Sequence, residues 1–573
     1  MRSLGRTIVI ASLIVAPGIV RAADDRDLFL SSIVARAAEK SVAPEAAGRE
    51  PGDVLATVAG VRSFPVACAT PLVDLFIRPD ASLAPGLLPA AAAVAGRPSL
   101  EAEKISLTRD GRFALHYAGG PSASGLMSVD RDRNGVPDLV DRVGEALQAS
   151  RSYLVTRLGY PPPAAEGERL DLYLMPLGHS LEGYAVPRPD GPGFIVLDSA
   201  LTADRVMPAT LHQVSHLSLL SLSRRAPRWW TEGSASFLTL LATGDMKSHE
   251  ASLRARLQAP GEGLASDGML LMEGSMLWPL FLAERSGDPS VVRQVWEEMA
   301  AQGLDPLAAA DSVLRRSGRS LLDAWREFVA WNLFTGDRDD GQHYSAGRSM
   351  PTSALSPAGT DVPLRLETSD PVEPMGTAAF RLALDDRRGT IDFEIAAEGG
   401  RPAADLLVYY RPWGQQPVLV PAPAFDGAGT ARVSVPWADA REAWIVLRND
   451  ALPGGGSARF EVRANADAYA PYDLAALSAS DVGSSILLEW TTASEQGLQA
   501  WNIYRSEAPG GPFTRLNSVA VPAMGDSSGE TGYIYVDDFA RPGRRYYYLL
   551  EGLTNLGLPQ RSHVVSGRIA QRN

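Results

Sequence analysis

Residues 211–216 read LHQVSH and residues 229–235 read WWTEGSA, and these two stretches are the most informative in the chain. In the first, His212 and His216 are four residues apart, so on a helix they lie one turn apart on the same face. In the second, Glu232 follows His216 by sixteen residues and is expected on another helix. Two imidazoles and a carboxylate form a tetrahedral zinc site with one position open to water. The spacing therefore predicts zinc ligation by His212, His216 and Glu232.

An H-x-x-x-H pair on its own is most often a pair of ordinary helix residues, so the same fold without metal is the alternative interpretation. The downstream W-x-E-G-x-A pattern, with Glu232 at gluzincin spacing, favours zinc ligation. The zinc content of the purified protein would distinguish the two.

The region around these motifs, from Lys104 to about Met350, has the pattern of an α+β domain. Apolar residues recur at three- and four-residue steps in several segments, as in amphipathic helices. Short β-rich runs precede the helix that carries His212. The predicted strands are 112–117, 170–174 and 193–197, and the predicted helices are 138–158, 208–223, 276–285, 291–299 and 321–334.

After Pro351 the helical pattern ends, and short strands separated by Gly, Pro and Asp replace it, as is typical of β-sandwiches. A second β unit begins near Pro471 and resembles a fibronectin type III domain, with Trp490 as its core tryptophan. A tyrosine of the late strand 545–550 is the expected corner residue. The first sandwich is predicted to contain strands 378–384, 390–395, 406–410, 431–435, 443–447 and 458–462.

Four blocks carry a resemblance to a known family: GRFALHY at 111–117, NGVPD at 134–138, the His212 to Glu232 unit, and FVAWNLFTG at 328–336 followed by Arg338. The chain resembles secreted bacterial zinc metalloproteases of myxobacteria and related Gram-negative bacteria, over about residues 111–350. The resemblance implies a zincin-like α+β core of the gluzincin type, followed by two β-sandwich domains, the last of them fibronectin type III-like. It also implies that a protein or peptide is the substrate or ligand.

Gln213 departs from this family's pattern at its most informative position. The family motif is H-E-x-x-H, in which the glutamate accepts a proton from the zinc-bound water and passes it to the leaving amine. A glutamine cannot accept that proton. Loss of general acid–base catalysis removes roughly 3–5 kcal/mol of transition-state stabilisation. Zinc binding is not excluded, because this position does not ligate the metal.

Three interpretations of the function follow. A catalytically impaired pseudo-metalloprotease, which binds zinc and acts in binding or scaffolding, fits Gln213 directly. An active or slow secreted zinc endopeptidase is the alternative, and it requires another carboxylate such as Glu273 to replace the missing base. The third interpretation is the metal-free fold. The sequence therefore leaves open whether the chain is an enzyme.

A calcium site is predicted in the loop DRDRNGVPDLVD at residues 130–141. Oxygen atoms stand at loop positions one, three, five, seven, nine and twelve, and Gly135 permits the sharp bend at position six. The aspartate at position twelve is shorter than the usual glutamate, which predicts weak, structural binding. The alternative is that the last two carboxylates only stabilise the start of a helix. The predicted Ca²⁺ ligands are Asp130, Asp132, Asn134, the Val136 carbonyl, Asp138 and Asp141.

The first 22 residues have a basic head, an apolar run from Ile8 to Val20 and small residues before Asp24. This is the pattern of a cleaved secretory signal, so export to the periplasm or out of the cell is expected. The apolar run is shorter than the about 20 residues that span a bilayer, and no membrane span is expected. Cys68 is the only cysteine, which excludes an intramolecular disulfide.

The length of 573 residues suggests roughly three to five structural units. A net charge of −13 provides no basic field for a phosphate backbone, so nucleic acid is not an expected partner. Residues 23–105 combine a short helical stretch at 28–40, a strand-like piece at 74–77 and an Ala/Pro-rich segment. The expected organisation is a signal peptide at 1–22, a pro-region or arm at 23–105, a metallopeptidase-type domain at 106–350, a β-sandwich at 351–466 and a fibronectin type III-like domain at 467–573.

Overall fold

A computed structural model of the chain describes Leu55 and most of the sequence from Ala67 onward. The predicted signal peptide at 1–22 and the predicted helical stretch at 28–40 lie outside the described residues. Within the described part, no helix is both long enough and apolar enough to cross a membrane. The described ranges are 67–77, 94–119, 125–178, 180–188, 191–359, 362–384, 390–410, 417–437, 440–467, 472–495, 498–525, 529–554 and 559–570, together with residue 55.

The chain divides into two compact units, each of which is described by itself. The first unit extends to Pro260 and continues over Leu264–Ser353. The second contains Gly261–Gly263 and everything from Ala354 onward. The protein is thus multi-domain, with helices and one sheet in the first unit and several β-sheets in the second.

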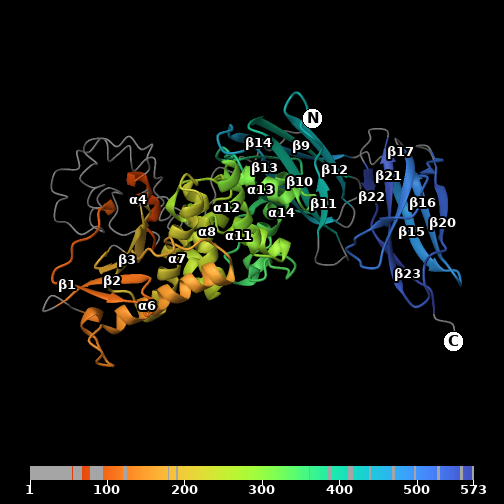
Figure 1. The fold of residues 1–573 in the computed structure, drawn as a ribbon. Helices are drawn as coiled ribbons and strands as arrows, with labels where there is room; N and C mark the ends of the chain where they lie inside the picture. The colour runs from red at the N-terminus through yellow and green to blue at the C-terminus, as the bar shows by residue number, and fades with distance from the viewer. Residues whose placement is uncertain are drawn as a thin grey trace. The chain divides into compact units, whose positions relative to one another are not determined.

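The first unit contains a five-stranded sheet with the strand order β1-β2-β3-β5-β4. Figure 1 labels its strands β1, β2 and β3. Its three inner strands β2, β3 and β5 are parallel, whereas the edge strands β1 and β4 are antiparallel to their neighbours. The inner strands are almost wholly buried, as expected for parallel strands covered on both faces. The bounds are β1 Glu103–Leu107, β2 Phe113–Ala118, β3 Leu170–Met175, β4 Gly183–Val186 and β5 Phe194–Asp198.

Helices make up the rest of this unit. The helix α6 packs against β2 and against α7, and α7 in turn contacts β4, β5 and α8. Each predicted helix corresponds to an observed one, although α7 begins earlier than predicted and contains Pro208. The bounds are α4 Thr70–Ile77, α6 Asp138–Arg151, α7 Ala203–Leu222, α8 Arg228–Thr243, α9 Glu250–Gln258, α10 Met269–Gly274, α11 Leu277–Ser286, α12 Ser290–Gln302, α13 Pro306–Arg315 and α14 Leu321–Leu333. Shorter helical turns lie at Gly125–Ser128, Ser152–Arg157, Lys247–His249, Gly336–Arg338 and Gly347–Ser349.

The strand-like piece predicted at residues 74–77 is wrong, because these residues form the end of the helix α4. Pro71 lies in the first turn, where its missing N–H is not needed and its fixed φ favours the helix. Leu72 and Val73 are fully buried, and the Asp74 carboxylate pairs with Arg228 of α8 at 3.1 Å. A short apolar run has too few residues to show a period, so packing decides its conformation.

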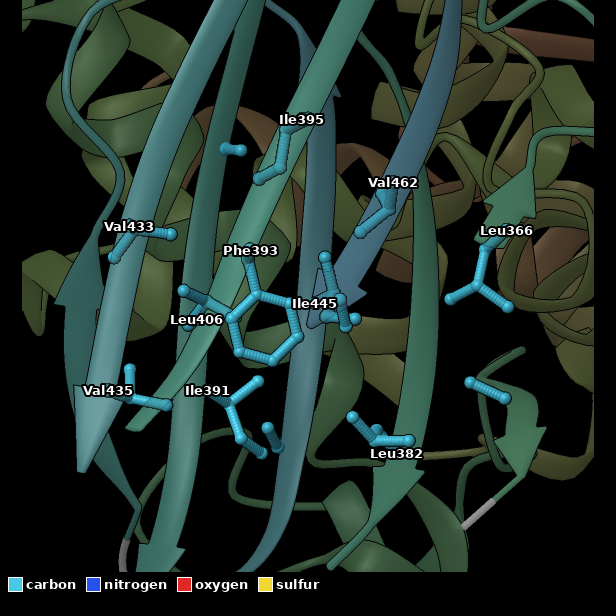
Figure 2. Packing of buried hydrophobic residues seen from close by; sticks show 14 of the residues in the cluster. Leu366, Leu382, Ile391, Phe393, Ile395, Leu406, Val433, Val435, Ile445 and Val462 are labelled. Atoms are coloured by element: carbon cyan, nitrogen blue, oxygen red, sulfur yellow. The ribbon is translucent and has the colours of Figure 1, made fainter. Parts of the chain in front are cut away.

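The second unit begins with two sheets that share one hydrophobic core, which is a β-sandwich as predicted (Figure 2). The strand orders are β11-β10-β13-β8-β6 and β12-β9-β14-β7. In Figure 2 the ring of Phe393 on β9 lies between Leu406 of β10 and Ile445 of β13, and all three belong to this core. The bounds are β6 Ser356–Gly359, β7 Leu364–Glu367, β8 Gly376–Ala383, β9 Thr390–Gly399, β10 Pro402–Tyr410, β11 Val418–Pro421, β12 Thr430–Pro436, β13 Ala440–Asn449 and β14 Ala458–Asp467.

The last strands form a second pair of sheets, one with the order β15-β16-β20 and one containing β18-β17-β21-β22. Trp490 is 1% exposed and lies in the core between them, as predicted. Tyr546 is the tyrosine of the late strand whose hydroxyl accepts a bond from the backbone N–H of Arg541, at 3.4 Å. The bounds are β15 Asp473–Asp481, β16 Ile486–Ser494, β17 Leu498–Ser506, β18 Thr514–Arg515, β19 Val521–Pro522, β20 Thr531–Asp537, β21 Arg545–Thr554, β22 Pro559–Arg561 and β23 Val565–Arg568.

Candidate metal centre

The helix α7 carries His212, Gln213 and His216 on its buried side. It contacts β4, β5 and α8, so this stretch is enclosed by the sheet and by its partner helix. The two imidazole rings lie 4.7 Å apart and nearly perpendicular, at 80°. The four-residue spacing therefore brings the rings together on one helix face, as a shared metal ligation would require.

Glu232 is supplied by α8, which starts directly after Pro227 and ends at Gly244, a glycine in the left-handed region with φ +67°. The next residue, Gly233, has no side chain because a Cβ there would lie 3.0 Å from the backbone carbonyl carbon of Ser275. This close approach of the following chain fixes the depth of α8 in the core. Glu232 is 2% exposed, with its carboxylate directed at the two histidines.

The three predicted zinc ligands converge on one point. His212 Nε2 lies 2.9 Å from Glu232 Oε1, and His216 Nε2 lies 3.2 Å from Glu232 Oε2. The two Nε2 atoms are 3.1 Å apart. In a tetrahedral zinc site with bonds of about 2.0–2.3 Å, neighbouring ligand atoms are roughly 3.3–3.8 Å apart. The cluster therefore has the donor types and nearly the spacing of a zinc first shell.

The chemistry of the donors also fits a cation. Glu232 Oε2 is buried and accepts no hydrogen bond with good geometry from any described residue. A buried carboxylate oxygen without a donor costs free energy unless a positive charge neutralises it. Two imidazole nitrogens that face each other across this carboxylate likewise need a proton or a cation between them. The buried cluster can therefore bind a metal ion.

Cys68 is a member of the same cluster, and the sequence pattern did not identify it. Its Sγ lies 3.4 Å from His216 Nε2, and the residue is 4% exposed. The candidate ligand atoms of Cys68, His212, His216 and Glu232 all lie within 4.8 Å of one another. Cys68 precedes His212 by 144 residues, so no local spacing links the two.

The charges in the cluster shift one another's pKa. Burial would raise the pKa of Cys68, and so would the carboxylate of Glu232, but His212 and His216 lower it to about 7. Burial would lower the pKa of His212, but Glu232 and Cys68 raise it well above its ordinary value. Burial would also raise the pKa of Glu232, but the two histidines hold it far below its usual range. Without a metal the cluster thus favours an anionic carboxylate beside protonated imidazoles. Because imidazole nitrogens ligate a metal only when they are deprotonated, metal binding here must release these protons.

Gln213 is 1% exposed and uses both ends of its carboxamide. Its Oε1 accepts the hydroxyl of Thr70 at 2.9 Å, and its Nε2 lies 3.4 Å from Cys68 Sγ. The Thr70 hydroxyl oxygen accepts a hydrogen bond from the backbone N–H of Ala185 at 3.0 Å, so the hydroxyl hydrogen is available to donate to Gln213. The side chain in the family's general-base position thus forms hydrogen bonds through both its oxygen and its nitrogen.

A cavity of about 100 Å³ opens beside the cluster and is lined by His212, Glu232 and Cys68. Ligand pockets usually measure about 300–1,000 Å³, so this space is smaller than a typical ligand pocket. Glu273, the proposed surrogate base, lines the same cavity. Its Oε1 lies 3.1 Å from His249 Nδ1. A carboxylate–imidazole pair therefore lies near the cluster.

The predicted calcium loop, residues 130–141, precedes α6 and overlaps its first turn. Carboxylate oxygens of Asp130, Asp132 and Asp138 come within 4.8 Å of one another. The Asn134 side chain donates to Asp132 at 3.1 Å and to Asp141 at 2.9 Å. Backbone N–H groups of the loop also donate to these side chains, for example Gly135 to Asp130 at 2.9 Å, and Val136 to Asn134 at 2.7 Å. The helix α6 has both Asp138 and Asp141 in its first turn, as the cap interpretation requires.

Comparisons with known proteins do not extend this description. No protein-family model matches the chain, and no curated sequence matches it. Similar solved structures include an Fn3-like protein from Clostridium thermocellum, at 23% identity over 18% of this chain and 95% of that one, with a TM-score of 0.13. A periplasmic inhibitor of g-type lysozyme from Aeromonas hydrophila is 12% identical over 19% of this chain and 97% of that one, with a TM-score of 0.14. TM-scores this low carry no argument about fold or function.

Proposed function

We propose that this chain is a secreted zinc-binding protein with a gluzincin-like core, a catalytically impaired pseudo-metalloprotease that acts in binding or scaffolding. One observation carries the proposal: His212, His216 and Glu232 converge on one buried point, while a glutamine occupies the position of the general base. The retained donor set favours metal binding. The glutamine, hydrogen-bonded at both ends, favours the loss of proton transfer.

The architecture around the cluster supports this proposal. The mixed sheet, with the antiparallel edge strands β1 and β4, packs against α7, and α7 packs against α8, which is consistent with the α+β core that the resemblance implies. Zinc at this point would supply a Lewis acid and an acidified water. Gln213 cannot take a proton from that water, so hydrolysis is expected to be at least about 10²-fold slower than with a carboxylate.

A protein or peptide ligand is the proposed partner, as the resemblance to secreted metalloproteases implies. The predicted export signal at residues 1–22 supports a location outside the cytoplasm, in the periplasm or outside the cell. The alternative function is a slow secreted zinc endopeptidase. The position of Glu273 in the cavity next to His212 favours it, because a nearby carboxylate could act as the base.

Purified wild-type protein is expected to contain about one zinc per chain and to leave an unstructured protein substrate uncleaved. Metal analysis by mass spectrometry and an assay with fluorescein-labelled casein measure the two quantities. Hydrolysis that is lost in Glu273→Gln would establish the endopeptidase instead. Protein that contains no zinc and takes none up on addition would refute zinc binding altogether.

Calcium is expected to raise the melting temperature through the loop at residues 130–141, because an ion that binds only the folded state stabilises it by mass action. We propose Asp130, Asp132, Asn134, the Val136 carbonyl, Asp138 and Asp141 as ligands, with weak affinity. Thermal unfolding with and without excess calcium checks this, with Asp132→Ala as the variant that should lose the response. If calcium raises the melting temperature of Asp132→Ala as much as that of wild type, the loop does not bind the ion, and its carboxylates only stabilise the start of α6.

A further inference from the structure

The segment that carries Cys68 lies along the open edge of the five-stranded sheet. The carbonyl of Ala67 accepts the N–H of Glu182 at 2.8 Å and that of Gly183 at 3.3 Å. The N–H of Ala69 donates to the carbonyl of Gly183 at 3.1 Å, and Cys68 and Gly183 form a parallel β-bridge. Because β4 is the edge strand, this segment adds to the sheet as a very short further strand.

This pairing sets the direction of the Cys68 side chain. The Cys68 Sγ comes to 3.4 Å from His216 Nε2 and completes a group of four donor residues. Zinc sites closed by four protein ligands are structural, whereas catalytic sites keep one position open. A thiolate is also the ligand that zinc binds most readily among those available here.

The helix that follows holds the segment in place. Leu72 and Val73 of α4 are fully buried, and Asp74 pairs with Arg228, which begins the same helix that carries Glu232. The backbone N–H of Thr70 also donates to Cys68 Sγ at 3.4 Å. The thiol is therefore held by the packed core of the unit.

If Cys68 is a thiolate, as a zinc ligand would be, Gln213 suits this arrangement better than a glutamate; a neutral thiol could instead donate to Gln213 Oε1, which lies 3.9 Å from Sγ. The Thr70 hydroxyl accepts a hydrogen bond from the backbone N–H of Ala185 and donates one to Gln213 Oε1. The amide Nε2 of Gln213 therefore faces the sulfur of Cys68. A carboxylate could accept from Thr70 but could not donate to Cys68. It would also place a third negative charge beside a thiolate and Glu232. The replacement that removes the general base therefore supplies a hydrogen-bond donor to the sulfur.

We propose that Cys68 is the fourth zinc ligand and that Gln213 is its positioning residue, so that the metal centre is closed by the chain's own Ala67–Ile77 segment. This inference rests on the proposed zinc binding by His212, His216 and Glu232. The inference goes further than the proposed function. With three protein ligands and no general base, the zinc would still have one coordination position open to small molecules. A closed centre excludes them.

Cobalt substitution tests the proposal, because Co²⁺ bound by a thiolate has a near-ultraviolet charge-transfer absorption that nitrogen and oxygen ligands do not produce. The full chain is loaded with one Co²⁺ under a non-thiol reductant. Wild type is expected to show this band, whereas Cys68→Ser, which is nearly the same size, binds cobalt and lacks it. Gln213→Ala is expected to keep the band but to shift it to longer wavelength, since the sulfur loses a donor.

Access to the metal supplies the second readout. Acetohydroxamate, a small chelator, is expected to change the visible cobalt spectrum of Cys68→Ala and to leave that of wild type unchanged. A wild-type complex without the charge-transfer band, or one that responds to acetohydroxamate as Cys68→Ala does, would overturn the role of Cys68 while zinc binding stands. An unshifted band in Gln213→Ala would overturn the positioning role. Failure of wild type to bind cobalt or zinc at all would instead refute the proposed function.

Discussion

The double variant Cys68→Ala/Gln213→Glu is expected to cleave fluorescein-labelled casein at least about 10²-fold faster than wild type. Two obstacles to hydrolysis are removed together in this variant. A glutamate at position 213 can accept a proton, and the absence of the thiol frees a coordination position. General acid–base catalysis is typically worth about 10²–10⁴-fold, which sets the size of the gain.

The single variants are the matched controls for this result. Gln213→Glu alone is expected to stay at background because Cys68 still closes the centre, and Cys68→Ala alone because no base is present. Adding His216→Ala to the double variant should return it to background. Activity in Gln213→Glu equal to that of the double variant would contradict closure by Cys68. A double variant that binds zinc and remains inactive would mean that further catalytic groups are missing, and would favour a pure binding role.

His216→Ala is expected to abolish zinc binding and to lower stability strongly. His216 is fully buried and contributes one of the converging nitrogens, so its loss leaves an incomplete first shell beside the buried carboxylate of Glu232. With free zinc at about 1,000 times the dissociation constant, metal binding stabilises the folded state by about 4 kcal/mol, and the variant loses this term. Metal analysis and thermal unfolding with added zinc measure both effects.

Ser215→Ala is the matched control for this experiment. Ser215 is also fully buried on α7, and among the described residues its hydroxyl bonds to the Leu211 carbonyl one turn earlier, at 2.8 Å. It is expected to keep its zinc and to respond to a chelator as wild type does. If His216→Ala retained one zinc per chain, the assignment of this residue as a ligand would be wrong.

The helix pair at the centre could be predicted because its signal is local. The spacing of His212 and His216 is one helical turn, and the turn residues around Pro227 and Gly244 delimit the helix that carries Glu232. The strands β2, β3 and β5 were predicted within a residue or two at each end because they are short, mostly apolar runs with clear limits.

Cys68 could not be predicted because its position depends on long-range strand pairing. It comes close to His216 only because the segment around it bridges to Gly183 at the sheet edge. The sequence around it is Ala- and Pro-rich, without a ligand pattern of its own. The same segment misled the interpretation of residues 74–77, where packing against β4 favours a helix that an apolar run alone does not specify. A single cysteine in a chain with a predicted export signal and a predicted zinc site was the one available signal.

X-ray absorption at the zinc edge of the purified full chain tests the central claim most directly, because it reports the kind and the distance of each ligand atom. The arrangement of Cys68, His212, His216 and Glu232 predicts one sulfur at about 2.3 Å and nitrogen and oxygen atoms at about 2.0–2.2 Å. A spectrum with only nitrogen and oxygen ligands would contradict closure by Cys68. Protein that neither contains nor takes up zinc would contradict the metal centre itself.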